Sequence, residues 1–322
     1  MTEFELIRRF FTRRTPGAIL GVGDDAALVR VREGMELAVS VDLLIEGRHF
    51  FAKTDPVLLG HKALAVNLSD MAAMGAKPRW ATLGLALQRA DARWLEAFAR
   101  GFLGLARKHG VDLIGGDTTR GPLAISVQIM GEVPHGQALR RDRARIGDDV
   151  WVSGRLGGAA LAVAVAKGEL RVPVRERRSL QQRLDAPVPR IALGIALRGV
   201  ARSAIDVSDG LLADLGHICE RSKLGAVIEW ESLPATPFVR ALAQRSDIAV
   251  HSILAGGDDY ELCFTASPRR RPDVVAAARR ARTEVMLIGR ITRRRVGAPL
   301  VEVLDSIGKP LKVRRRGYDH FR

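Results

Sequence analysis

The sequence predicts a mixed α/β (α+β) fold in two halves, in which helices cover one face of each sheet. Hydrophobic patterns typical of strands and of helices follow each other along the whole chain. The 322 residues are enough for two domains of ordinary size. The pattern breaks once, around residues 134–147, into a basic segment that we interpret as a linker or mobile loop. We therefore expect one domain over residues 1–138 and a second over residues 139–322.

The first half begins with an amphipathic helix over residues 3–14 and continues with alternating strands and helices. Asp55 is a good N-cap, Pro56 suits the first helical position and Gly75 a left-handed stop, so a second helix fills the space between. The apolar spacing predicts a third helix over residues 92–109, which Gly110 ends. Strands are expected at residues 37–42, 80–87, 111–114 and 123–133.

The second half repeats this mixture. Strands are expected at residues 149–153, 204–207, 226–230, 260–265 and 285–288. Helices are expected after Gly157-Gly158, at residues 189–200, from Leu212 through Cys219, and at residues 272–282.

The helix that begins at Pro56 places two polar residues on its apolar stripe. Asn67 and Asp70 lie one turn apart and share the face that carries Leu59, Ala63 and Val66. A carboxylate on such a face must be paired, hydrogen-bonded or bound to a metal, because an unpaired buried charge is very costly. A structural cap or a buried hydrogen-bond network is the alternative interpretation.

Further carboxylates stand at predicted strand ends or tight turns. They are Asp24-Asp25, Asp42, Asp117, Asp206 with Asp209, and Asp258-Asp259. A single aspartate in a turn is usually a local hydrogen-bonding device. If the fold brings several together, their repulsion requires bound cations, and oxygen ligands without a His/Cys cluster favour Mg²⁺ over zinc.

Composition limits the function classes. The formal net charge of +15 favours anionic partners, whereas 5% aromatic residues and the absence of a zinc-finger spacing argue against specific nucleic-acid recognition. No apolar run is long enough to predict a membrane span, and the start of the chain does not read as a secretory signal. Cys219 and Cys263 are expected to be buried free thiols in a reducing cytoplasm.

Common nucleotide-binding motifs are missing. There is no P-loop, Gly21-x-Gly23 lacks the rest of a dinucleotide fingerprint, and no protein-kinase catalytic loop occurs. An ATP-using enzyme of this sequence must therefore hold phosphates through metals, glycine-turn amides and arginines. Phosphoryl transfer can proceed in this way because it depends mainly on positioning and charge neutralisation.

Eight segments, spread from residue 21 to residue 321, carry a resemblance to a known family. They are G-V-G-D-D-A-A-L (21–28), S-V-D (40–42), G-R-H-F (47–50), K-A-L-A-V-N-L-S-D-M-A-A-M-G-A-K-P (62–78), L-I-G-G-D-T-T-R-G (113–121), S-A-I-D-V-S-D-G-L (203–211), G-G-D-D-Y-E-L (256–262) and G-Y-D-H-F (317–321). Together they resemble the thiamine-monophosphate kinase family, within the aminoimidazole ribonucleotide synthetase-like ATP-binding superfamily.

The resemblance implies a two-domain fold of that superfamily. The N-terminal sheet-plus-helices domain would bind ATP and Mg²⁺ and pair with its twin in a homodimer, and the C-terminal α/β domain would close over nucleotide and substrate. It also implies that ATP phosphorylates thiamine monophosphate to thiamine diphosphate with the help of several Mg²⁺ ions.

The resemblance assigns residues by matching motif. Metal ligands would be Asp25, Ser40, Val41 through its main-chain carbonyl, Asp42, Asp70, Asp117, Asp206 and Asp209, of which Asp42, Asp70 and Asp117 would be catalytic. ATP contacts would be Gly116, Asp117, Ser208 and Arg141, with Arg140, Arg143 and Arg145 as alternatives to the arginine. His49, Asp258 and Tyr318 would line the thiamine-phosphate pocket.

Three residues depart from the family pattern. Val41 stands where Thr is frequent, Asp258 where Glu is common, and Arg48 replaces a smaller polar residue. None of these changes removes a metal-bearing carboxylate.

Two alternatives remain at this point. The first is another ATP-using enzyme of the superfamily that activates an amide or a selenium compound, although no reactive Cys stands near the N-terminus. The second is a non-catalytic nucleotide-binding or nucleic-acid-binding protein that uses the positive charge.

Overall fold

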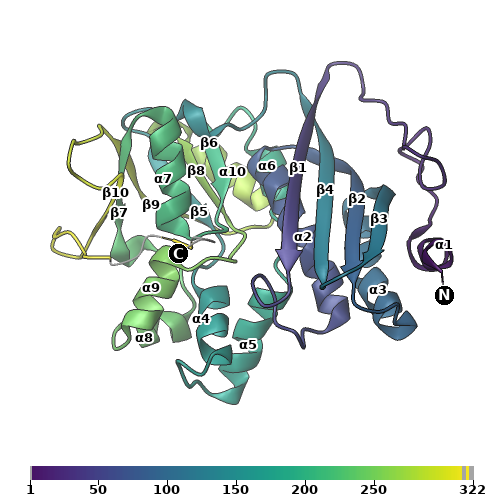
Figure 1. The fold of residues 1–322 in the computed structure, drawn as a ribbon. Helices are drawn as coiled ribbons and strands as arrows, with labels where there is room; N and C mark the ends of the chain where they lie inside the picture. Colours follow the sequence, from purple (N-terminus) through teal and green to yellow (C-terminus); the bar gives the residue numbers. More distant parts are fainter. Residues whose placement is uncertain (1, 314–316, 319–322) are drawn as a thin grey trace. The chain divides into compact units, whose positions relative to one another are not determined.

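The computed structural model describes residues 2–313 and 317–318 of the chain. The chain divides into two compact units. The first consists of Met1–Met71 with Ala76–Gly136, and the second of Ala72–Gly75 with Gln137–Arg322. Both units are mixed α/β, as the sequence predicts (Figure 1). No helix among the described residues is long and apolar enough to cross a membrane.

The first unit is built on a four-stranded sheet. Its strands are β1 (Met35–Ile45), β2 (Lys77–Leu87), β3 (Asp112–Arg120) and β4 (Ala124–Pro134), in the order β1-β4-β2-β3. β4 pairs antiparallel with both β1 and β2, whereas β2 and β3 are parallel. β1 and β3 are therefore the two edge strands of this sheet.

Two long helices pack against each other beside the sheet. They are α2 (Pro56–Ala73) and α3 (Ala92–His109). A Cβ at Gly60 would lie 2.1 Å from the Phe98 carbonyl oxygen, and one at Gly101 would lie 1.9 Å from that of Val57. Glycine at these positions lets the two helix backbones approach closely. Asp55 caps α2 through the Val57 N–H, at 2.7 Å, and Gly75 takes the expected left-handed conformation, with φ 64°.

The second unit contains a six-stranded sheet in the order β10-β7-β9-β5-β8-β6. The strands are β5 (Asp149–Ser153), β6 (Ser203–Asp206), β7 (Gly225–Glu229), β8 (Leu262–Ala266), β9 (Val285–Thr292) and β10 (Val301–Leu304). The helices are α4 (Gly158–Ala166), α5 (Val174–Asp185), α6 (Ile191–Ala196), α7 (Leu211–Ser222), α8 (Pro237–Ala243), α9 (Asp247–Ala255) and α10 (Arg271–Arg280). Every residue of β5 and β8 is buried, so the middle of this sheet is covered on both faces. Figure 1 shows α7 along one of these faces.

Several predicted boundaries are wrong, each for a local reason. The helix expected at residues 3–14 is α1 (Glu3–Leu6) followed by a π-helical turn, Ile7–Phe11, and it ends there. The strand expected to stop at Ile114 continues to Arg120, because the pairing with β2 shifts register at Ile114 and resumes from Gly115, and Gly116 then adopts φ 149°. Asp117 thus lies in a strand rather than a turn.

Candidate functional site

Ser40 and Asp42 of β1 face Asn67 and Asp70 of α2. The two-residue period of β1 sends Ser40 and Asp42 to the side that α2 covers. The Ser40 hydroxyl donates to Asp70 Oδ2 at 2.6 Å, and the Asp42 N–H donates to Asn67 Oδ1 at 3.2 Å. The Asn67 side-chain N–H donates in turn to the Ala63 carbonyl, which fixes the amide. We call these four residues the β1–α2 oxygen cluster.

The β1–α2 oxygen cluster carries an excess of negative charge. Burial, and then the charge of Asp70, raise the pKa of Asp42 to about 7. Two carboxylates that face each other in this way are stabilised by a proton or by a cation. The atoms of these side chains that could bind a metal are all oxygens, which are the ligands that Mg²⁺ prefers. The residues present therefore fit a magnesium ion.

A second acidic region lies at the opposite edge of the sheet. A cavity of about 550 Å³ brings the turn that carries Asp24 and Asp25 next to the β3 segment with Gly116 and Asp117. Its apolar wall comes from Phe4, Ile7 and Phe11. A Cβ at Gly116 would lie 2.0 Å from the Leu83 carbonyl oxygen, so only glycine fits this bend.

The two acidic regions are separate within the first unit. Asp42 lies on edge strand β1 and Asp117 on edge strand β3, with β4 and β2 between them. Three strand spacings place the two backbones roughly 14 Å apart. Among the described residues, no group of three or more His, Cys, Asp or Glu side chains is close enough to hold one metal ion. Within one unit, the predicted ligands thus form two groups.

His49 and Val41 are placed differently from the oxygen cluster. His49 lies in a tight turn after β1, where its Nδ1 accepts the Ile45 N–H at 3.0 Å. Gly47 allows this turn through its φ of 79°. The Val41 side chain is 60% exposed on the outer face of β1. Only its main chain could serve as a ligand to an ion at the inner face.

In the second unit, the loop after β6 carries Asp206, Ser208 and Asp209. The Asp214 carboxylate accepts the backbone N–H groups of Ser208, Asp209 and Gly210 at 3.1, 3.1 and 3.0 Å. Burial, followed by the charges of Asp206 and Asp209, raises the pKa of Asp214 well above its ordinary value. Asp214 was not among the residues predicted from the sequence. An acid in the first turn after Gly210 was the available signal, since acids are enriched there.

Two distant segments dock on this loop. The Asp258 N–H donates to the Ser208 carbonyl at 2.8 Å, and the Tyr318 N–H donates to the Asp209 carbonyl at 3.0 Å. The structure therefore brings together Ser208, a predicted ATP contact, Asp209, a predicted metal ligand, and Asp258 and Tyr318, two predicted substrate contacts. Their roles remain predictions. The Tyr318 side chain is 48% exposed.

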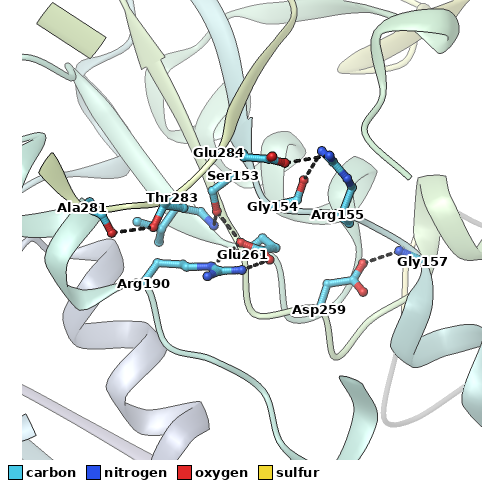
Figure 2. A network of polar contacts seen from close by, with 11 residues as sticks. Ser153, Gly154, Arg155, Gly157, Arg190, Asp259, Glu261, Ala281, Thr283 and Glu284 are labelled. Atoms are coloured by element: carbon cyan, nitrogen blue, oxygen red, sulfur yellow. Dashed lines mark hydrogen bonds and ion pairs between the residues drawn. The ribbon is translucent and has the colours of Figure 1, made fainter. Parts of the chain in front are cut away.

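A buried ion pair supports the start of β8 (Figure 2). Glu261 accepts two hydrogen bonds from Arg190, at 2.6 and 2.5 Å, and one from the Ser153 hydroxyl at 2.5 Å. Glu261 belongs to the motif at residues 256–262 but was assigned no role from the sequence, and neither Arg190 nor Ser153 was predicted to contact it. Residues more than 70 positions apart meet here, which no local pattern reveals.

The basic segment before β5 contains an exposed ion pair and a short 3₁₀ turn. Arg140 pairs with Asp142 at 2.6 Å, and Arg141 begins the short 3₁₀ turn Arg141–Arg143. The Arg141 side chain is exposed, and its carbonyl accepts the Ser222 hydroxyl. The role of Arg141 in ATP binding remains a prediction.

Comparisons with known proteins connect both units to one family. The family model "AIR synthase related protein, N-terminal domain" matches residues 23–133, and the corresponding C-terminal domain model matches residues 145–301. The thiamine-monophosphate kinase of Escherichia coli (strain K12) is 43% identical over 325 residues, which cover 99% of this chain and 98% of the relative. This chain belongs to the thiamine-monophosphate kinase family. The resemblance found in the sequence motifs is confirmed.

Solved structures agree with the family membership. The crystal structure of thiamine-monophosphate kinase from Stenotrophomonas maltophilia K279a is 48% identical, with a TM-score of 0.83, over 93% of this chain and 94% of that one. The structure of AaThiL complexed with AMPPCP and TMP is 29% identical, with a TM-score of 0.77, over 99% and 96% of the two chains. The hydrogenase maturation protein HypE, at 22% identity and a TM-score of 0.77, shares the fold.

Proposed function

We propose that this protein transfers the γ-phosphoryl group of ATP to thiamine monophosphate, which yields ADP and thiamine diphosphate. The observation that carries the proposal is the 43% identity to a thiamine-monophosphate kinase over 99% of the chain. The AaThiL complex with an ATP analogue and TMP supports the choice of both substrates. The carboxylates of the oxygen cluster and of the docked loops of the second unit are suited to Mg²⁺ ions that carry phosphates and to an organic cation.

The transfer needs little acid–base chemistry. A phosphate oxygen of thiamine monophosphate is already anionic at neutral pH, so it can attack the γ-phosphorus in line without a strong general base. The obstacle is the repulsion between two anions. The protein therefore has to hold both phosphates in line and keep water away while the charge moves.

We propose that several Mg²⁺ ions assist the reaction. When bound, they neutralise the charge of the phosphates. Ser40, Asp42 and Asp70 would hold one part of this set, Asp25 and Asp117 a second part, and Asp206 with Asp209 a third. The pKa of Asp42, raised by burial and by Asp70, supports a cation in the first group.

The proposed contacts to ATP and to thiamine monophosphate also come from both units. Gly116 and Asp117 line the cavity of the first unit, whose apolar wall suits the base of a nucleotide. Ser208 and Arg141 are the proposed ATP contacts from the second unit. His49, Asp258 and Tyr318 are the proposed contacts to thiamine monophosphate.

We also propose a homodimer. The outer face of edge strand β1 presents five apolar side chains in register. They are Leu37, Val39, Val41, Leu43 and Ile45, with exposed fractions of 43, 51, 60, 52 and 39%. A long apolar edge strand is a hazard for aggregation unless a partner covers it. A second copy of this chain would cover the face.

A cytoplasmic location is part of the proposal. Cys219 and Cys263 are free and buried, which suits a reducing compartment.

An ADP-release assay with Mg·ATP tests the proposed function. Thiamine monophosphate, free thiamine and no acceptor are compared at equal ATP. We expect rapid ADP release only with thiamine monophosphate. Equal ADP release with and without thiamine monophosphate would contradict the proposal.

A further inference from the structure

The turn before β8 contains two strained residues that are not glycine. Asp258 has φ 68° and Tyr260 has φ 49°, both in the left-handed region. Residues other than glycine adopt this region at a cost, and they keep it only where surrounding contacts enforce it. Such residues are concentrated at functional sites.

Backbone hydrogen bonds enforce the turn from one side. Asp258 N–H donates to the Ser208 carbonyl and Tyr260 N–H to the Val207 carbonyl, each at 2.8 Å. The Val207 N–H returns a bond of 2.7 Å to the Glu261 carbonyl. The turn is thus fastened to the loop that carries Ser208.

Side-chain hydrogen bonds also hold the turn (Figure 2). The Asp259 carboxylate accepts the Gly157 N–H at 2.7 Å, at the start of α4. Glu261 is held by Arg190 and Ser153. The side chains of Asp259 and Glu261 therefore hold the turn in place. The alternate residues, Asp258 and Tyr260, interact with each other.

The pair is joined by a hydrogen bond. The Tyr260 hydroxyl donates to Asp258 Oδ1 at 2.9 Å, and both side chains are half-buried. A hydrogen bond to one oxygen restricts the rotation of the carboxylate, so it favours one direction for the remaining acceptor positions. The two residues that make this bond are the same two that have a strained backbone conformation.

We propose that Tyr260 is a positioning residue for the substrate. Its hydroxyl orients the Asp258 carboxylate toward the cationic organic part of thiamine monophosphate. This inference rests on the proposed function, which assigns Asp258 to the substrate pocket.

The chemistry of the substrate determines which part Asp258 contacts. A carboxylate repels the phosphate group, whereas the thiazolium ring is a cation and the aminopyrimidine offers N–H donors. Hydrogen bonds to a charged acceptor are stronger than neutral ones, but they depend on direction. Tyr260 therefore acts on the affinity for the organic part, and it leaves ATP binding and the transfer step unchanged.

The test compares Tyr260→Phe with the wild type in steady-state kinetics. We expect the KM for thiamine monophosphate and the inhibition constant of free thiamine each to rise about tenfold. We expect kcat and the KM for ATP to change less than about twofold. Thr283→Val is the matched control, since it removes a hydroxyl that bonds to the Ala281 carbonyl elsewhere in this unit. It should leave all four constants unchanged.

Asp258→Asn and the double variant separate positioning from folding. With the acceptor charge removed, Tyr260→Phe should add less than about twofold to the KM of Asp258→Asn. If Tyr260→Phe does not fold, as shown by the lack of a cooperative melting transition, Asp258→Asn replaces it as the test. The inhibition constant of free thiamine for Asp258→Asn should then be at least tenfold higher than for the wild type. An unchanged constant there, or an unchanged KM in a folded Tyr260→Phe, overturns the inference while the wild-type activity still supports the proposed function. A wild type that releases no ADP with thiamine monophosphate overturns both.

Discussion

Ser40 of β1 and Asp70 of α2 are joined by a hydrogen bond of 2.6 Å. The bond connects edge strand β1 to helix α2, which carries most of the longest family motif, residues 62–78. Asp42 lies two residues further along the same face of β1. From its position in the sequence alone, Asp70 could be either a structural group or a metal ligand. The structure gives it a partner and also a neighbouring carboxylate, which a purely structural hydrogen bond does not require.

Asp70→Asn should separate these roles. The amide keeps the shape and can accept from Ser40, so the fold should persist, but the ligand charge is lost. We expect kcat to fall at least about a hundredfold, because charge neutralisation is the main catalytic term in phosphoryl transfer. Added Mg²⁺ should raise the melting temperature of the wild type more than that of the variant, which keeps the other two proposed ligand groups. Glu284→Gln, a change at an exposed side chain, is the control and should keep the wild-type kcat. An unchanged kcat in Asp70→Asn would remove Asp70 from the mechanism.

Val39→Glu tests the proposed homodimer. Val39 is 51% exposed on the outer face of β1, so a glutamate is harmless in a monomer but costly beneath a second copy. We expect light scattering to report twice 35.1 kDa for the wild type and 35.1 kDa for the variant. Val296→Glu, at a fully exposed position of the second unit, should keep the wild-type mass. A wild type that is monomeric at micromolar concentration would contradict the dimer.

Asp259 gives stability a specific dependence on pH. Burial, and to a lesser extent the charge of Glu261, raise its pKa from 3.8 to about 8, against the Gly157 N–H, which lowers it. The folded state therefore holds a proton that the unfolded state releases, so the stability from this group is complete below about pH 4 and lost as the pH rises to about 8. In urea unfolding, the free energy of unfolding of Asp259→Asn should rise relative to that of the wild type between pH 5 and pH 8, by up to about 1.4 kcal/mol per pH unit. A difference that stays constant over this range would show that Asp259 is ionised in the folded protein.

The Arg190–Glu261 pair should matter more for stability than an exposed pair in the same unit. The Glu261 side chain is 4% exposed, and Glu261→Gln leaves Arg190 without its ionic partner. We expect a loss of about 3 kcal/mol in the free energy of unfolding. The Arg155–Glu284 pair has a comparable distance of 2.7 Å, but Glu284 is 73% exposed, so Glu284→Gln should cost less than about 1 kcal/mol. Equal losses in urea unfolding would mean that burial does not govern these pairs.

The sequence predicted much of this structure because its strongest signals are local. The cap at Asp55 and the stops at Gly75 and Gly110 bound two long helices within a residue or two. Helix α5 was missed because its charged sequence, V-R-E-R-R-S-L-Q-Q-R-L-D, buries only a narrow stripe. The short helices α8 and α9 and strand β10 gave too little periodicity to be predicted.

The candidate site was predictable only in part, for a physical reason. Motifs identified the acids themselves, including Asp42 and Asp70, but which acids meet depends on strand order. The order β1-β4-β2-β3 places Asp42 and Asp117 on opposite edges, and no residue pattern near either one reveals this. Asp214 accepts the N–H groups of the loop that carries Ser208, and Glu261 pairs with Arg190; these partners are set by the tertiary fold.

The most direct test of the central claim follows the phosphoryl group itself. ATP labelled at the γ-phosphate is incubated with Mg²⁺, the protein and thiamine monophosphate, and the products are separated. A direct transfer predicts one labelled thiamine diphosphate for each ADP formed, with the label in the terminal phosphate. Label found only in inorganic phosphate, with no labelled thiamine diphosphate, would contradict the account.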